Sequence, residues 1–143
     1  MAAAAAVLVL LGLVQLEGYG TLLIAPFAAS AMLAIAAPDL PFSQPRAIVG
    51  GNVIAAFCGV LAAMFLGGNI LPPVAAASAA IGLMFATRTA HAPAAATAIV
   101  AASAEPSWWF IAFPVLAGTI VVVLFAAIYH RALFRHAYPK TWV

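Results

Sequence analysis

Long apolar runs separated by isolated charged residues dominate the chain. Glu17 closes the first run, residues 2–16, and 41 uncharged residues lie between Arg46 and Arg88. That stretch is too long for one membrane crossing, because a spanning helix uses about 20 residues. Asn69 and the prolines after it divide the stretch into two helices, since proline favours the first turn of a helix. The pattern therefore predicts six helical segments, at residues 2–16, 20–37, 46–66, 72–87, 93–104 and 107–134.

Alanine and leucine fill these segments, and the alternation of apolar and polar residues that marks barrel strands is absent. The sequence therefore predicts an all-α fold, a polytopic transmembrane helical bundle whose helices pack closely through small side chains. The segment at 93–104 has 12 residues, which is short for a full crossing. We expect it to be a half-helix or a re-entrant piece.

Composition argues against a water-soluble domain. Of the 143 residues, 68% are hydrophobic and 6% are charged, whereas soluble domains carry about 25% charged residues. The mean hydropathy is +1.21. We expect an integral membrane protein with a single domain over residues 1–143 and the lipid bilayer as its main partner. The five basic and three acidic residues form no basic stripe, which argues against nucleic-acid binding.

The few charges indicate how the chain is oriented. Positively charged residues favour the cytoplasmic side of a membrane. With six crossings, Arg46, Arg88 and the basic tail at 130–143 fall on one side, and Glu17 and Glu105 fall on the other. We therefore expect a multi-pass protein of a bacterial inner membrane, or of the equivalent organellar membrane, with both termini in the cytoplasm.

A shift of 67 residues aligns the chain with itself. The stretch Ala25-Pro26-Phe27-Ala28-Ala29-Ser30-Ala31 then lies over Ala92-Pro93-Ala94-Ala95-Ala96-Thr97-Ala98, and Gly51 lies over Gly118. Alanine matches alanine easily in this composition, so the coincident prolines, hydroxyl residues and glycines carry the argument. A three-plus-three duplication would have halves at 1–67 and 68–134, inverted in the membrane because each has three crossings. Inverted repeats recur in transporters, which bind their substrate where the halves meet.

The repeated prolines point to a binding site. Pro26 and Pro93 each suit the first turn of a short apolar helix, where the missing N–H has no intrahelical partner. The other first-turn N–H groups carry the positive end of the helix dipole, so two such ends facing each other near the bilayer midplane would attract a small anion. Ser30 and Thr97, one turn along, could add hydroxyl donors. Asn52 could line the site or pack against a neighbouring helix.

Ionisable residues stand just before Pro93. His91 could bind an anion when protonated or relay a proton, and it could instead hydrogen-bond a neighbouring helix end. Arg88 could hold an anion with its fork of donors, or it could be a loop charge that sets the topology. Asp39 could be a proton site, although its place between Pro38 and Leu40-Pro41 favours capping a turn or pairing with Arg46. The candidate site therefore comprises His91, Arg88, Pro93, Thr97, Pro26, Ser30 and Asn52.

Several blocks occur in an order that resembles the HPP family of integral membrane proteins, over nearly the whole chain from about residue 20. They are Phe27-Ala28-Ala29-Ser30-Ala31, Ala36-Ala37-Pro38-Asp39, Gln44-Pro45-Arg46, Gly50-Gly51, the stretch Thr87 to Ala98, Trp108-Trp109-Phe110, Pro114 and Tyr138-Pro139-Lys140-Thr141-Trp142. The family's His-Pro-Pro triplet begins at His91 but has Ala92 in its middle position. Asn52 stands where a histidine commonly follows the paired glycines. The resemblance implies a membrane protein with fewer spans than the segments predicted here and, because some members are implicated in nitrite transport, a small-anion transporter.

Signatures of catalysis are absent from the sequence. It has no paired carboxylates, no nucleophile elbow, no phosphate-binding glycine loop and no cysteine and histidine cluster with metal spacing. We therefore expect no enzymatic activity, no cofactor and no metal. The leading interpretation is a permease for a small inorganic anion of nitrite's size, and the alternative is a non-transporting membrane scaffold or assembly subunit. The smooth, alanine-rich surface is compatible with a homo-oligomer.

Overall fold

The computed structural model describes residues 20–67, 70–104, 107–134 and 137–141, and within these ranges all regular structure is helical. The elements are α2 (Gly20–Ala36), the 3-10 turn η1 (Pro41–Ser43), α3 (Pro45–Leu66), α4 (Leu71–Ala86), α5 (Ala92–Ala104), η2 (Ile111–Leu116), α6 (Ala117–Tyr129) and η3 (His130–Phe134). The predicted all-α class is confirmed. The first predicted segment, residues 2–16, lies outside the described residues.

Prolines and one glycine mark the helix boundaries. Pro45 begins α3, Pro72 lies in the first turn of α4, and Pro93 is the second residue of α5. Proline is tolerated there because the first-turn N–H groups have no intrahelical partner. Gly67 ends α3 with a φ of 71°, a left-handed conformation that glycine adopts without steric cost. The predicted bounds of these three helices are each within one residue of those observed.

Pro26 does not begin a helix, so its predicted first-turn position is wrong. α2 starts six residues earlier, at Gly20, and runs through Pro26 to Ala36. A proline inside a helix removes one backbone hydrogen bond and commonly breaks the helix. In a membrane bundle the helix continues through the proline. If it stopped there, the backbone N–H and C=O groups of residues 20–25 would have no water to bind, and neighbouring helices shield the one hydrogen bond that Pro26 removes. Of the two predicted proline-led ends, the structure has only the one at Pro93.

The last predicted segment, 107–134, is a long helix in three parts, η2, α6 and η3. Phe113 interrupts it with an extended backbone (φ −141°, ψ 123°). Pro114 accounts for the break, because its ring disfavours the helical conformation of the preceding residue.

Helix lengths divide the bundle into two classes. The 22 residues of α3 and the 23 residues of Ile111–Leu133 are long and apolar enough to cross a membrane, whereas the apolar helices at 23–36, 71–86 and 92–104 are shorter. A helix of 13 residues such as α5 is only about 20 Å long, against a hydrocarbon core of about 30 Å. The structure agrees with the expectation that the segment at 93–104 is short for a full crossing.

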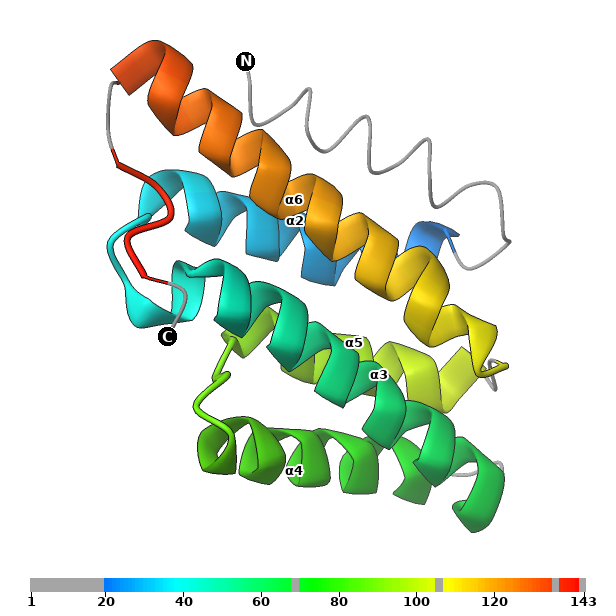
Figure 1. Cartoon of the computed structure of the whole chain (residues 1–143). Helices are drawn as coiled ribbons and strands as arrows, with labels where there is room; N and C mark the ends of the chain where they lie inside the picture. Colours follow the sequence, from blue (N-terminus) through cyan, green and yellow to red (C-terminus); the bar gives the residue numbers. More distant parts are fainter. Residues whose placement is uncertain (1–19, 68–69, 105–106, 135–136, 142–143) are drawn as a thin grey trace.

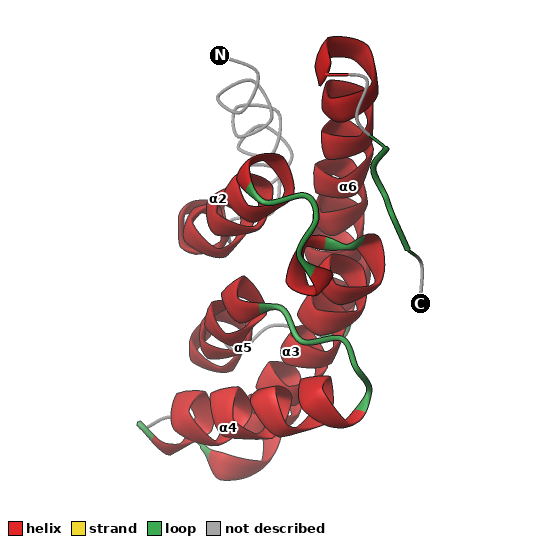
Figure 2. Cartoon of the chain, turned by 90° about the vertical axis from the view of Figure 1, so that its left-hand side faces the viewer, coloured by secondary structure: helices red, strands yellow, loops and turns green. Residues whose placement is uncertain are grey.

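The helices alternate in direction along the chain (Figure 1). Figure 2 shows α5 between α2 and α4, with α3 alongside, and α5 packs on all three. One end of the bundle therefore gathers the end of α2, the start of α3, the connection from α4 to α5 and the C-terminal segment (Figure 1). The described basic residues all belong to segments at this end: Arg46, Arg88, Arg131 and Lys140. We call it the basic end.

The 67-residue shift agrees with this arrangement. It places α3 over residues 112–133, which is nearly the whole of the long helix at Ile111–Leu133. It also places α2 over α5, and both pairs run antiparallel (Figure 1). The duplication itself stays a prediction, because the helix that would correspond to α4 falls among residues 1–19, outside the described part.

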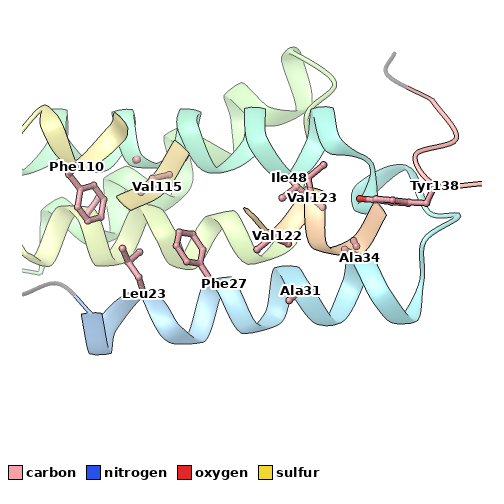
Figure 3. Packing of buried hydrophobic residues seen from close by; sticks show 13 residues of the cluster. Leu23, Phe27, Ala31, Ala34, Ile48, Phe110, Val115, Val122, Val123 and Tyr138 are labelled. Atoms are coloured by element: carbon pink, nitrogen blue, oxygen red, sulfur yellow. The ribbon is translucent and has the colours of Figure 1, made fainter. Parts of the chain in front are cut away.

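Two apolar clusters hold the helices together. The first contains large side chains where α2 meets α6, including Leu23, Phe27, Phe110, Val115 and Val122 (Figure 3). The second lies between α3, α4 and α5 and is almost entirely alanine, with Ala55, Ala76, Ala80, Ala94 and Ala98 among its members. Small side chains allow helix backbones to approach closely, and van der Waals contact then replaces the hydrophobic driving force that lipid does not provide.

Gly59 marks the closest approach between α3 and α5. A Cβ atom added there would lie 2.7 Å from the carbonyl oxygen of Ala98 and would collide with the Cβ of Ala101. We therefore expect Gly59→Ala to lower the free energy of unfolding by about 1–3 kcal/mol, the usual cost of overpacking. Thermal unfolding in detergent, followed by circular dichroism, measures the effect.

Gly82→Ala is the matched control, because a Cβ added to Gly82 on α4 meets no atom within 4 Å. Alanine is the better helix former, so this variant should be unchanged or slightly more stable. Equal loss of stability in both variants would contradict the close α3–α5 contact.

Candidate functional site

His91 is the centre of a buried polar cluster at the start of α5. It lies in the connection after α4, one residue before α5, and its side chain is 1% exposed. Its Nε2 lies 2.8 Å from the hydroxyl of Ser30 on α2, and its Nδ1 lies 2.8 Å from the carbonyl oxygen of Phe42 in η1. One ring therefore joins the start of α5 to α2 and η1, whose bonded residues lie 61 and 49 positions earlier in the chain.

Gly51 on α3 provides the space for this ring. A Cβ at Gly51 would lie 2.9 Å from the Cβ of His91 and 2.8 Å from the carbonyl oxygen of Thr89. The paired glycines at 50 and 51 were the sequence signal for this close approach, although their partner could not be read from the sequence.

The proton positions around His91 follow from its partners. The Phe42 carbonyl can only accept, so Nδ1 carries a proton and donates. The single Ser30 hydroxyl proton has two acceptors, because Ser30 Oγ also lies 2.8 Å from the carbonyl oxygen of Pro26. With neutral His91, Ser30 donates to Nε2; with protonated His91, Nε2 donates to Ser30 and the hydroxyl donates to Pro26. Both protonation states of the ring are therefore fully hydrogen-bonded by the same three residues.

Asn52 and Thr97 form a second buried pair, between α3 and α5. The Thr97 hydroxyl donates to Asn52 Oδ1 at 2.6 Å, and Asn52 Nδ2 donates to the carbonyl oxygen of Ile48 at 2.8 Å. Both side chains are fully buried. Thr119, the counterpart of Asn52 in the repeat, donates instead to carbonyl groups of its own helix. The pair thus links two helices, and each of its polar side-chain atoms already has a partner within the protein.

Arg88 lies at the surface, apart from the buried cluster. It ends α4 with a left-handed φ of 57°, while Thr89 N–H donates to the carbonyl oxygen of Met84 and Arg88 N–H to that of Phe85. This is a helix-ending motif usually built on glycine. Within the described part of the chain, the Arg88 guanidinium has no hydrogen bond or ion pair. Arg46 donates to the carbonyl oxygen of Thr87 at 3.0 Å.

A cavity of about 330 Å³ opens beside His91. Its walls come from η1, the last turns of α4 and the first turn of α5, and they include Phe42, Met84, Ala92 and Ala95. The beginning of α5, with Pro93 in its first turn, therefore borders open space on this face. The walls are apolar apart from His91.

The C-terminal segment, residues 137–141, packs against the loop between α2 and α3, which sequence reasoning missed. Tyr138 is 1% exposed and its hydroxyl donates to the carbonyl oxygen of Ser43 at 2.8 Å. Gln44 Oε1 accepts from the backbone N–H groups of Lys140 and Thr141. Burial raises the pKa of Tyr138 to about 12, so its phenol remains a donor.

Asp39 forms an exposed ion pair with Lys140, Oδ1 to Nζ 2.8 Å. The expected pairing with Arg46 is not the one found. The sequence showed that the C-terminal segment is basic. It did not show where this segment packs, because its hydrogen-bond partners, such as Ser43, lie about 95 residues earlier in the chain. Among the described residues, no group of three histidine, cysteine or acidic side chains comes together as a metal site would need.

The Thr97–Asn52 bond allows a direct test of the buried polar pair. Thr97→Val removes the hydroxyl and leaves Asn52 Oδ1 buried without a donor, which costs about 1–3 kcal/mol. Thr97→Ser retains the donor and should restore most of the stability, as measured by thermal unfolding. Ser103→Ala, an exposed change on the same helix, is the control and should stay within about 0.5 kcal/mol of the parent. Equal melting temperatures for Thr97→Val and Thr97→Ser would refute the role of the hydroxyl.

Comparison with known proteins places these features in a family. A family profile described as "HPP, transmembrane region" matches residues 1–139. Two proteins of Dictyostelium discoideum, both named as transmembrane proteins, are 35% and 31% identical over 90% and 89% of this chain. The chain spans 44% and 47% of their lengths. No solved structure matches it. The chain is an integral membrane protein and belongs to the HPP transmembrane family.

Proposed function

We propose that the chain is a multi-pass permease for a small inorganic anion of nitrite's size, with its binding site at the start of α5. The observation that carries the proposal is that His91 and the first turn of α5 border the same open cavity. The first-turn N–H groups carry the positive end of the helix dipole, and a protonated imidazole would add a full charge beside it. The HPP resemblance leads to the same class of solute.

The hydrogen bonds of His91 suggest how an anion would enter. In this conformation Nε2 is engaged by Ser30. Protonation of the ring turns the Ser30 hydroxyl to the Pro26 carbonyl, so that Nε2–H donates to Ser30 Oγ, and an entering anion would replace Ser30 as the acceptor of this proton. Nδ1–H keeps its bond to Phe42 throughout, so the ring is held in place. The proposed consequence is that one proton and one anion bind together at His91.

Charge distribution supports a membrane orientation for this mechanism. We propose that the basic end faces the cytoplasm, with both termini on that side, because arginine and lysine favour the cytoplasmic surface. Trp108 and Trp109 lie just before the long helix, at the opposite end, where they are 48% and 62% exposed. Aromatic side chains of this kind favour the membrane interface. Arg88, exposed at the basic end, would concentrate anions near the cavity.

A proteoliposome assay tests the proposal. Nitrite uptake driven by an inward proton gradient should exceed uptake in protein-free vesicles. His91→Ala should abolish uptake, because the proton and anion site is lost. His91→Gln keeps a hydrogen-bonding side chain that does not titrate, so we expect nitrite exchange at equal pH to persist while accumulation driven by the proton gradient disappears.

Arg131→Gln is the control for this assay, since it removes a positive charge from the basic end without touching the His91 cluster, and its uptake should be unchanged. Each variant is first checked for the parent's melting temperature. If folded parent protein gives no more flux than protein-free vesicles, the permease proposal fails and a scaffold or assembly role takes its place.

A further inference from the structure

A second cavity, of about 490 Å³, lies between α3 and α6. Arg46, Val49 and Gly50 line it from α3, and Ile120, Val123 and Leu124 line it from α6. Ile120 and Leu124 are 42% and 56% exposed, so the groove opens outward, while Val123 at its wall belongs to the first apolar cluster. In a membrane its long, aliphatic walls therefore face lipid chains.

Arg46 places a positive charge within this groove, near the basic end. It is the second residue of α3. One of its five N–H donors binds the Thr87 carbonyl oxygen, which orients the guanidinium and leaves further donors for another acceptor. Among the described residues no carboxylate pairs with it, because Asp39, at the same end, binds Lys140. The groove thus combines aliphatic walls with one oriented cation that is not paired with a carboxylate of the described residues.

We propose that this groove binds an anionic glycerophospholipid, with an acyl chain along the walls of α3 and α6 and its phosphate on Arg46. Basic pockets between membrane helices recognise lipid headgroups in this way, and a guanidinium fork matches phosphate oxygens. A free phosphate would leave the apolar walls uncovered. A second copy of the chain offers little to Arg46, since the whole sequence has only three acidic residues. This inference is independent of the transported solute.

The single cysteine allows lipid binding to be measured through its effect on thermal unfolding. Cys58 is its single cysteine and is 6% exposed in α3. A thiol-reactive fluorophore therefore reports unfolding of the purified full chain on heating in neutral detergent. Added phosphatidylglycerol should raise the melting temperature by several degrees by mass action, whereas phosphatidylcholine with the same acyl chains should raise it less.

Two variants separate the charge from the groove. Arg46→Gln should require about fivefold more phosphatidylglycerol for the half-maximal shift, the factor expected for one basic residue near an anionic headgroup. Leu124→Trp keeps Arg46 but fills the groove with a larger side chain, and it should weaken the lipid effect as well. Arg131→Gln removes a charge outside the groove and should leave the shift unchanged. Melting temperatures without added lipid show that each variant is folded.

Four other results would each contradict the proposal that the groove binds an anionic lipid. Equal shifts with the two lipids would remove its charge selectivity. Loss of the shift in Arg131→Gln as large as in Arg46→Gln would indicate diffuse surface charge. A shift reproduced by glycerol phosphate would indicate a site for a free anion. A lipid-independent dimer that Leu124→Trp dissociates, seen by size-exclusion chromatography with light scattering, would assign the groove to a second copy.

Discussion

The bundle depends on one constraint, that polar groups in a lipid environment find their hydrogen-bond partners inside the protein. Every buried side-chain nitrogen and oxygen in the described part of the chain has such a partner. Ser30 and Thr119 bond to carbonyl groups one turn back on their own helices, while His91 and His130 bond to carbonyl groups of other segments. The same constraint explains why α2 continues through Pro26. If the helix began at Pro26 instead of Gly20, the backbone groups of residues 20–25 would lose their hydrogen-bond partners.

Two kinds of packing surround the short helix α5. Alanine and glycine bring α3 and α4 close to it, whereas larger side chains fill the space between α2 and α6. Close backbone contact positions α5 on several sides, although it is too short to cross a bilayer alone. Its beginning is held by the bonds of His91 to α2 and η1. A short helix in the middle of the bundle can thus present its first turn at a defined place.

Both cavities are lined in part by residues near the basic end of the bundle. One borders His91 and the start of α5, and the other contains Arg46 between α3 and α6. The docked C-terminal segment lies at the same end, held by Tyr138 and Gln44. His91 and Arg46, on which the two proposals rest, therefore both lie near one end of the bundle, and the buried polar side chains of the described residues are hydrogen-bonded within the protein.

Sequence alone determined the membrane environment, the helical class and most helix bounds, because hydropathy and first-turn prolines act through local contacts. It also singled out His91, Ser30, Asn52 and Thr97, since polar residues in apolar runs are few. It did not determine that Ser30 pairs with His91, that Asn52 pairs with Thr97, or that the tail docks on Gln44, because these bonds join residues 45 to 97 positions apart. Pro26 shows the limit most clearly: the apolar run predicted the segment at 20–37, which α2 matches closely, whereas proline chemistry favoured a helix start at Pro26, and the structure keeps this proline inside α2.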